Sequence, residues 1–330
     1  MTQPVISVLT DHPRLVDEAF LERLRDLGTV NHYSQPQRMN SSDLSSVLRE
    51  TDVAVTGWTS PLLPVEAAAS IGKLKYICHM TGEMKRIIPP DFIRAGVLVT
   101  NWGDAFAFAT AEGAVALLLS VLKDIRSLDS QCRSKGKCEV DTTRPFLTLK
   151  DTSVGLYGIG AIGRCVAEML RPFGPRLFYY DPYVADAPLG MTPVPSLRDL
   201  FTACGIVSVH CGLTDATRGS VTYDLLSLLP DGGILINTSR GAVVNEKDLA
   251  KVLKTKRILA GIDVITDESD WRRSPLVDAP NVTLTGHSLF RIGPNEKTIL
   301  QEVAFTNIKA FLEGHPVKHV INEKRYWEMT

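Results

Sequence analysis

The sequence predicts an α/β protein made of two doubly wound domains, each built on a parallel β-sheet. Short apolar runs alternate with helical patterns almost from end to end, and this alternation is interrupted once, near Asn101. The length of 330 residues supports two domains, because a single hydrophobic core rarely grows beyond about 250–300 residues. An apolar fraction of 44% and a charged fraction of 22% are typical of a folded globular chain.

The first series of elements precedes Asn101. Buried strands are predicted at residues 5–9, 53–56, 76–78 and 97–100. Helices are predicted at residues 14–27 and 64–71. The strands are apolar throughout rather than alternating, which indicates a parallel sheet covered by helices on both faces.

The second series follows a long helix predicted at residues 105–126 and a polar stretch around Gly136. Its six strands are predicted at residues 154–157, 177–180, 206–210, 234–237, 260–264 and 282–285. Six such strands match a dinucleotide-binding fold. A last amphipathic helix is predicted at residues 296–312, before Gly314 and Pro316.

A glycine-rich turn joins the strand at 154–157 to a helix predicted at 164–170. Gly158, Gly160 and Gly163 have the GxGxxG spacing. In that motif the first glycine allows the tight turn, the second lets the backbone approach a pyrophosphate, and the third allows close helix–strand packing. The helix N-terminus then offers free N–H groups to the phosphates. Alone the motif is weak, but strand and helix flank it here.

An acidic residue about 20 positions further on, at the end of the next strand, is the second test of this motif. Asp181 stands there, next to Pro182. It could also be a turn former. A carboxylate suits the ribose hydroxyls and repels the extra phosphate of NADP, so NAD is the predicted cofactor.

Together these observations predict a Rossmann NAD-binding domain, residues 103–294, inserted into a flavodoxin-like substrate domain. The substrate domain comprises residues 1–102, and the C-terminal helix within residues 295–330 returns to it.

Several classes of function are disfavoured. A net charge of −1 with mixed charges argues against nucleic-acid binding. The most apolar stretch, residues 113–122, is too short to cross a membrane, and the N-terminus lacks the charged region of a signal peptide. Six scattered cysteines, of which Cys132 and Cys138 match no zinc or disulfide pattern, favour free thiols, no metal and a cytoplasmic location.

Three polar residues follow the last strands of the second series. Arg240 lies beyond 234–237, Glu268 beyond 260–264 and His287 beyond 282–285. Parallel sheets bind ligands outside the carboxyl ends of their strands, so the three should share one edge. Each could have a plainer role, as a solvated Arg or Glu or as a buried His with satisfied hydrogen bonds; their common placement favours catalysis.

Reduction of a 2-oxo acid needs these residue types. Arg240 can bind the substrate carboxylate bidentately and polarise the carbonyl. His287 can donate the proton, because an ordinary imidazole titrates near pH ~6.5. Glu268 would hold the other ring nitrogen and favour the charged form. General acid catalysis of this kind is worth about 10²–10⁴ in rate.

These motifs resemble the D-isomer-specific 2-hydroxyacid dehydrogenase family, which includes phosphoglycerate dehydrogenase and glyoxylate/hydroxypyruvate reductases. The resemblance is densest from Gly155 to His287. It implies that Arg240, Glu268 and His287 are catalytic and that the enzyme is a homodimer. The NAD contacts that it implies, beyond the three glycines, are Ala161, Ile162, Asp181, Cys211, Thr217, Thr238 and Asp263.

The chain departs from the family where the substrate carboxylate is gripped. Residues 79–83 contain one glycine instead of a glycine-rich loop, and Thr81 and Gly82 are the expected substrate contacts. Gly212 and Gly286 also replace two usual prolines. Extra basic residues could bind a second anionic group on the substrate, or could simply be solvated: Lys85, Arg86, Arg272, Arg273 and Arg291.

Two other functions compete with 2-oxo acid reduction. The first is formate oxidation, against which Glu268 argues, because that reaction needs no proton donor and the resemblance implies an amide there. The second is an NAD(H)-sensing binding protein of the same fold, against which the intact trio argues.

Overall fold

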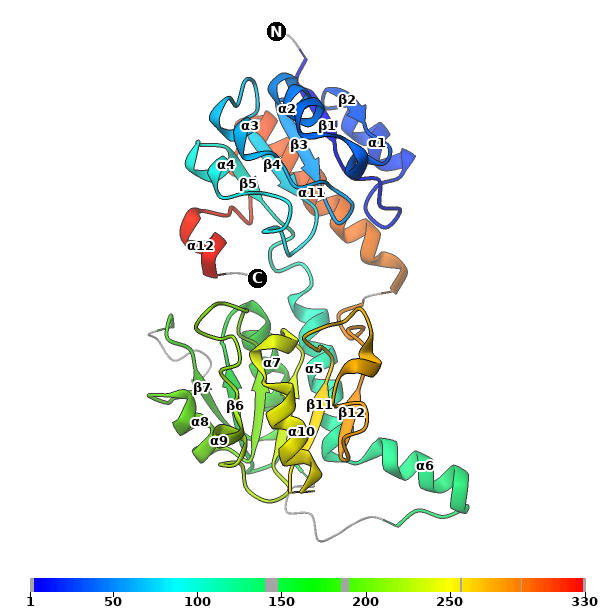
Figure 1. Ribbon diagram of the computed structural model, residues 1–330, viewed down its shortest axis with the longest axis vertical. Helices are drawn as coiled ribbons and strands as arrows, with labels where there is room; N and C mark the ends of the chain where they lie inside the picture. The colour runs from blue at the N-terminus through cyan, green and yellow to red at the C-terminus, as the bar shows by residue number, and fades with distance from the viewer. Residues whose placement is uncertain (1–2, 140–147, 185–189, 256, 292, 329–330) are drawn as a thin grey trace. The chain divides into compact units, whose positions relative to one another are not determined.

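The computed structural model describes residues 3–139, 148–184, 190–255, 257–291 and 293–328 (Figure 1). The chain divides into two compact units. Unit one comprises Met1–Phe106 together with Ile292–Thr330, and unit two comprises Ala107–Arg291. The second unit is therefore inserted into the first, as predicted. Among the described residues, no helix is long and apolar enough to span a membrane.

Unit one contains a parallel five-stranded sheet with the flavodoxin-like order β2-β1-β3-β4-β5. Its strands are β1 (Val5–Val8), β2 (Thr29–His32), β3 (Val53–Thr56), β4 (Tyr76–His79) and β5 (Leu98–Thr100). The four predicted strands are confirmed to within one residue. The edge strand β2 was missed, because its polar Thr-Val-Asn-His sequence is largely exposed and lacks an apolar signal.

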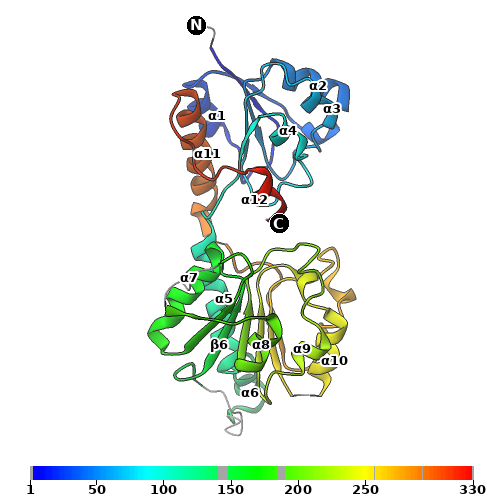
Figure 2. The ribbon, with the colours of Figure 1, turned by 90° about the vertical axis from the view of Figure 1, so that its left-hand side faces the viewer.

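Helices flank this sheet (Figure 2). The helices of unit one are α1 (Glu18–Arg25), η1 (Pro36–Arg38), α2 (Ser41–Glu50), α3 (Val65–Ala69), α4 (Asp91–Arg94), η6 (Gly293–Asn295), α11 (Glu296–Leu312) and α12 (Glu323–Glu328). Helix α1 begins later than the predicted residue 14, because Asp17 caps it by accepting a hydrogen bond from the N–H of Phe20. Helix α11 returns to the sheet, with the ring of Phe311 4.9 Å from the ring of Tyr76 on β4.

Unit two contains a parallel seven-stranded sheet in the order β12-β11-β10-β9-β6-β7-β8. The strands are β6 (Ser153–Tyr157), β7 (Arg176–Tyr180), β8 (Thr192–Pro193), β9 (Ile206–Val209), β10 (Ile234–Asn237), β11 (Leu259–Ile262) and β12 (Val282–Leu284). This is the Rossmann order with one added strand, and it reverses between β6 and β9. The six predicted strands are confirmed; the two-residue β8 was too short to predict.

Two apolar cores cover the faces of this sheet. The helices are α5 (Ala107–Leu122), α6 (Ile125–Lys135), α7 (Ala161–Leu170), η2 (Arg171–Phe173), α8 (Leu197–Ala203), α9 (Tyr223–Leu226), η4 (Gly241–Val243), α10 (Glu246–Lys254) and η5 (Trp271–Arg273). Helices α5 and α7 belong to one core, whereas α8, α9 and α10 belong to the other. The sheet therefore lies between these two cores.

The structure corrects two predictions after α5. The single helix expected at 105–126 is broken at Asp124, which has a left-handed φ of 53°, and α6 follows it. The expectation of free thiols is wrong for one pair: Cys132 and Cys138 are joined by a disulfide. The left-handed Gly136 ends α6 and turns the chain back, so that the two Cα atoms lie 5.3 Å apart. Cys78, Cys165, Cys204 and Cys211 are reduced cysteines outside the disulfide.

Candidate active site

The glycine turn after β6 brings backbone segments into very close contact. Gly158 has a φ of 93°, and a Cβ there would come 2.5 Å from the backbone nitrogen of Cys211. A Cβ on Gly163 would come 2.3 Å from the carbonyl oxygen of Gly158. Packing within the protein therefore accounts for the first and third glycines of the motif.

Gly160 is not required by packing. Its φ of −68° suits any residue, and a Cβ there would meet no atom of the described residues within 4 Å. Neither strain nor a close contact demands glycine at the N-cap of α7. The open space lies where Ala161 and Ile162 begin the helix, whose first N–H groups have no intrahelical acceptor. A pyrophosphate that approaches these groups would fill the space, so the turn fits a dinucleotide.

Asp181 lies directly beside this turn. Its Oδ2 accepts a hydrogen bond of 2.9 Å from the N–H of Ile159, and its Oδ1 accepts one of 2.9 Å from the N–H of Tyr183. The second bond closes a local turn, which is the turn-forming role that the sequence suggested for this residue. The carboxylate stands at the carboxyl end of β7, next to the switch point of the sheet.

Other predicted cofactor contacts also belong to loops at this edge. The hydroxyl of Thr238, just beyond β10, is buried and has no hydrogen-bond partner among the residues that the structure describes. The hydroxyl of Thr217 donates to the carbonyl of Gly212 at 2.7 Å. Burial raises the pKa of the Cys211 thiol to about 12, so it is neutral. An unpartnered buried hydroxyl costs free energy, and a ligand that bonded to Thr238 would remove that cost.

His287 and Glu268 are in direct contact. Nδ1 of His287 lies 2.7 Å from Oε2 of Glu268, and the two side chains are 37% and 38% exposed. His287 has a left-handed φ of 52°, a costly conformation for a residue with a side chain. The structure thus holds the imidazole in place at the expense of local strain.

Asp263, just beyond β11, holds the turn that carries His287. Its carbonyl accepts a 2.6 Å bond from the N–H of His287. Its Oδ1 accepts bonds from the hydroxyl of Thr285 at 2.6 Å and from the N–H of Ser288 at 3.1 Å. Asp263 was predicted as a cofactor contact; within the protein it organises residues 285–288.

Arg240 stands on the loop after β10, the neighbour of β11. Its carbonyl accepts a 3.1 Å bond from Nδ2 of Asn237, and its Nη1 donates to the carbonyl of Ser239 at 2.9 Å. The backbone at Gly241 approaches the next loop so closely that a Cβ would lie 1.9 Å from the carbonyl carbon of Ile265. The loops of Arg240 and Glu268 are therefore packed together.

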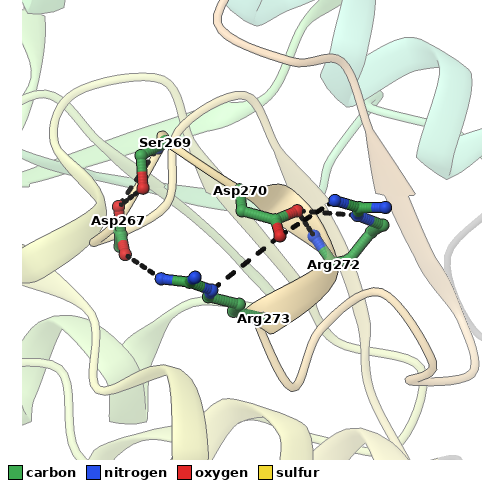
Figure 3. Close-up of polar contacts among 5 residues, drawn as sticks. All are labelled: Asp267, Ser269, Asp270, Arg272 and Arg273. Atoms are coloured by element: carbon green, nitrogen blue, oxygen red, sulfur yellow. Dashed lines mark hydrogen bonds and ion pairs between the residues drawn. The ribbon is translucent and has the colours of Figure 1, made fainter.

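The loop around Glu268 is crossed by ion pairs (Figure 3). Asp270 accepts bonds of 2.8 Å and 3.1 Å from Nε and Nη2 of Arg272, and the bonding lowers the pKa of its carboxyl. Arg273 lies 3.9 Å from Asp267 and 3.8 Å from Asp270. Two of the extra basic residues thus have carboxylate partners within this loop.

The expected substrate loop lies in unit one, where Thr81 is buried. Its hydroxyl lies 2.7 Å from Nε2 of His79, whose Nδ1 lies 2.9 Å from the hydroxyl of Thr56. Gly82 is held through its carbonyl by Nδ2 of Asn101 at 3.0 Å. Burial lowers the pKa of His79 to about 4, so it is neutral. This network was not predicted from the sequence, although a histidine at the end of a buried strand is a signal for it.

Comparison with known proteins agrees with this architecture. Residues 115–288 match the family model described as D-isomer specific 2-hydroxyacid dehydrogenase, NAD binding domain. The chain is 29% identical over 285 residues to a glyoxylate reductase of Korarchaeum cryptofilum, covering 84% of each. It is 29% identical over 320 residues to the glyoxylate reductase of Thermococcus litoralis, covering 94% of this chain and 95% of the relative.

A solved structure gives the same result in three dimensions. An acyclic imino acid reductase in complex with NADPH and D-Arg is 26% identical, has a TM-score of 0.79, and matches over 96% of this chain and 99% of its own. The family model, which covers more than half of the chain, and the shared two-unit fold lead to one conclusion. The chain belongs to the D-isomer-specific 2-hydroxyacid dehydrogenase family.

Proposed function

We propose that this protein is an NAD-dependent oxidoreductase that interconverts a small 2-oxo acid and its D-2-hydroxy acid. The observation that carries the proposal is the 2.7 Å contact between Nδ1 of His287 and Oε2 of Glu268. A carboxylate at one ring nitrogen fixes the orientation of the imidazole and the position of its proton. Nε2 is then the ring nitrogen left to exchange a proton with the substrate oxygen.

Arg240 completes the chemistry expected of the site. A guanidinium can bind a carboxylate bidentately while its positive charge polarises the neighbouring carbonyl. In reduction, the carbonyl carbon accepts hydride, which a nicotinamide dinucleotide supplies when bound, and the oxygen takes the proton of His287. In oxidation, neutral His287 removes the hydroxyl proton. Glu268 compensates the positive charge of the imidazolium in both directions.

NAD is proposed over NADP because of Asp181. Its carboxylate is anchored beside the glycine turn by the N–H groups of Ile159 and Tyr183. A second anion, such as a ribose phosphate, would be repelled at this position. The acyclic imino acid reductase was solved with NADPH, so the shared fold does not by itself select NAD. The proposed preference of this chain for NAD therefore rests on Asp181.

The proposed substrate carries a single carboxylate. Relatives are named for glyoxylate and hydroxypyruvate, which are small 2-oxo acids. A second anionic group would have to compete with Asp267 and Asp270 for Arg272 and Arg273. Arg291 stacks over the ring of Phe290, 5.8 Å from its centroid. Substrate contact by Thr81 and Gly82 and the homodimer both stay predictions.

One assay separates this proposal from its alternatives. NADH or NADPH oxidation is followed by absorbance with glyoxylate, hydroxypyruvate, other 2-oxo acids and phosphate-bearing 2-oxo acids, and NAD reduction is followed with formate. We expect activity on plain 2-oxo acids with NADH. Reduction of NAD by formate alone would favour formate oxidation, and tight NADH binding without turnover of any substrate would favour the sensor.

A further inference from the structure

The side chain of Glu246 joins the two ends of the loop that carries Glu268 through two hydrogen bonds, which we call the clip. Helix α10 begins at Glu246, whose side chain reaches back to this loop at two points. Oε1 of Glu246 accepts a hydrogen bond from the N–H of Thr266, and Oε2 accepts one of 2.6 Å from the hydroxyl of Ser274. Thr266 precedes the η5 turn and Ser274 ends it, so one carboxylate ties both ends of the Glu268 loop together.

The same segment also carries Arg240. Between Arg240 and Glu246 lies η4 (Gly241–Val243), and Gly241 packs against the backbone of Ile265. Residues 240–246 therefore touch the Glu268 loop at its start, through Gly241 and Glu246, and at its end, through Glu246. A shift of the loop relative to Arg240 would break these contacts.

The ion pairs within the loop cannot fix it to the segment of Arg240. Its ion pairs join Asp267 and Asp270 to Arg272 and Arg273, all within the loop itself (Figure 3). They give the loop its shape, but each of them joins two residues of the loop itself. They are also largely exposed, and exposed ion pairs contribute little. Ser274, in contrast, is buried, and bonds to a carboxylate are about twice as strong as neutral ones.

We propose that Glu246 is a positioning residue that sets the Glu268–His287 pair by fixing the Glu268 loop to the segment of Arg240. This inference rests on the proposed function, for which the pair is the proton donor. A displacement of about 1 Å at a catalytic group can cost about a hundredfold in rate. The alternative is that Glu246 only stabilises α10 as an acid in its first turn.

The test compares Glu246→Ala with Glu246→Gln and Lys247→Ala. Glutamine can still accept from Thr266 and donate to Ser274 but carries no charge, whereas alanine removes both bonds. Lys247 is the exposed neighbour on α10. We expect kcat for 2-oxo acid reduction to fall about a hundredfold in Glu246→Ala, with NADH affinity retained, and to stay near wild type in the other two variants.

A second readout does not depend on turnover. Histidine-selective NMR of the free protein should show a changed Nδ1 chemical shift for His287 in Glu246→Ala, because the hydrogen-bond partner Glu268 has moved away. Wild-type turnover together with a wild-type Nδ1 chemical shift of His287 in Glu246→Ala would overturn the proposal. Equal losses in Glu246→Ala and Glu246→Gln would assign Glu246 to helix stabilisation and overturn it as well.

Two further outcomes can be told apart: a Glu246→Ala variant that does not fold, and a wild-type protein that lacks the proposed activity. If Glu246→Ala does not fold, Ser274→Ala, which releases one end of the loop, carries the test: a smaller fall in kcat and a smaller change in the Nδ1 chemical shift of His287 are expected, and no change in either would overturn the clip. If the wild type reduces no 2-oxo acid, the proposed function fails, while the Nδ1 chemical shift of His287 still decides whether Glu246 sets the pair.

Discussion

Glu268 and His287 are 19 residues apart in sequence, and their side chains meet at 2.7 Å beyond two adjacent strands of the same sheet. Glu268 follows β11 and His287 follows β12. Because these strands are parallel and hydrogen-bonded to each other, the loops that follow them emerge side by side. The contact between Glu268 and His287 therefore follows from the order of the strands in the sheet.

Replacing His287 with alanine should lower kcat for 2-oxo acid reduction by about 10²–10⁴, because the general acid is lost. NADH affinity, measured by fluorescence, should change little, since the glycine turn lies in a different loop. His315→Ala is the matched control, because His315 is exposed and lies in the turn that follows α11. Turnover close to wild type in His287→Ala would remove this residue from the mechanism.

Replacing Glu268 with glutamine keeps the size of the side chain and removes its charge. The imidazolium then loses the carboxylate that compensates its charge. We expect a lower kcat for reduction at neutral pH. An unchanged kcat would show that the contact orients the ring without influencing proton transfer.

Replacing Asp181 with alanine should weaken NADH binding about tenfold or more, since a hydrogen bond to a charged group is worth about 1.5–3 kcal/mol. NADPH binding should weaken less or improve, because the repulsive charge is gone. Asp181→Asn separates the effect of charge from that of size. Titration of both cofactors by fluorescence is the measurement, and an unchanged preference would mean that another residue sets it.

The second and third glycines of the turn should respond differently to alanine. At Gly160 the added methyl group meets no atom within 4 Å in the described part of the chain, so the fold should be stable while NADH affinity falls about tenfold, or ~1.4 kcal/mol. At Gly163 it meets the carbonyl of Gly158 at 2.3 Å, so the free energy of unfolding should fall by about 1–3 kcal/mol. Thermal unfolding and NADH titration distinguish the two. Undiminished NADH affinity in Gly160→Ala would contradict the assignment of this space to a ligand.

Unit one should lose stability in mild acid because of His79. Its pKa is lowered to about 4 by burial in the folded protein, against an ordinary 6.5 in the unfolded chain. The neutral ring contributes fully above pH 6.5, and the unfolded state gains protons first as the pH falls, so about 3 kcal/mol should be lost between pH ~6.5 and ~4. Urea unfolding across this range, with His79→Gln for comparison, measures it. An equally steep pH dependence in His79→Gln would assign the loss to other groups.

The elements that the sequence predicted well are those with a strong local signal. Apolar strands such as β3 and β10 were placed at their observed bounds, because a short run of apolar residues between turns is typical of a buried strand. Edge strand β2 and helix α6 lack such a signal, since β2 is mostly exposed and α6 has no buried residue. The disulfide between Cys132 and Cys138 was also missed, because it depends on the left-handed turn at Gly136 that ends α6.

The two-domain α/β fold, the glycine turn with Asp181, and the candidates Arg240, Glu268 and His287 could be predicted from the amino-acid sequence, because each follows from residue type, spacing and position after a strand. Which of these side chains touch, and which other residues hold them, became clear from the three-dimensional structure. The contact of Glu268 with His287, the organising bonds of Asp263 and the two hydrogen bonds accepted by Glu246 join loops from different strands. Such contacts depend on distances through space between loops, and no local pattern in the chain encodes them.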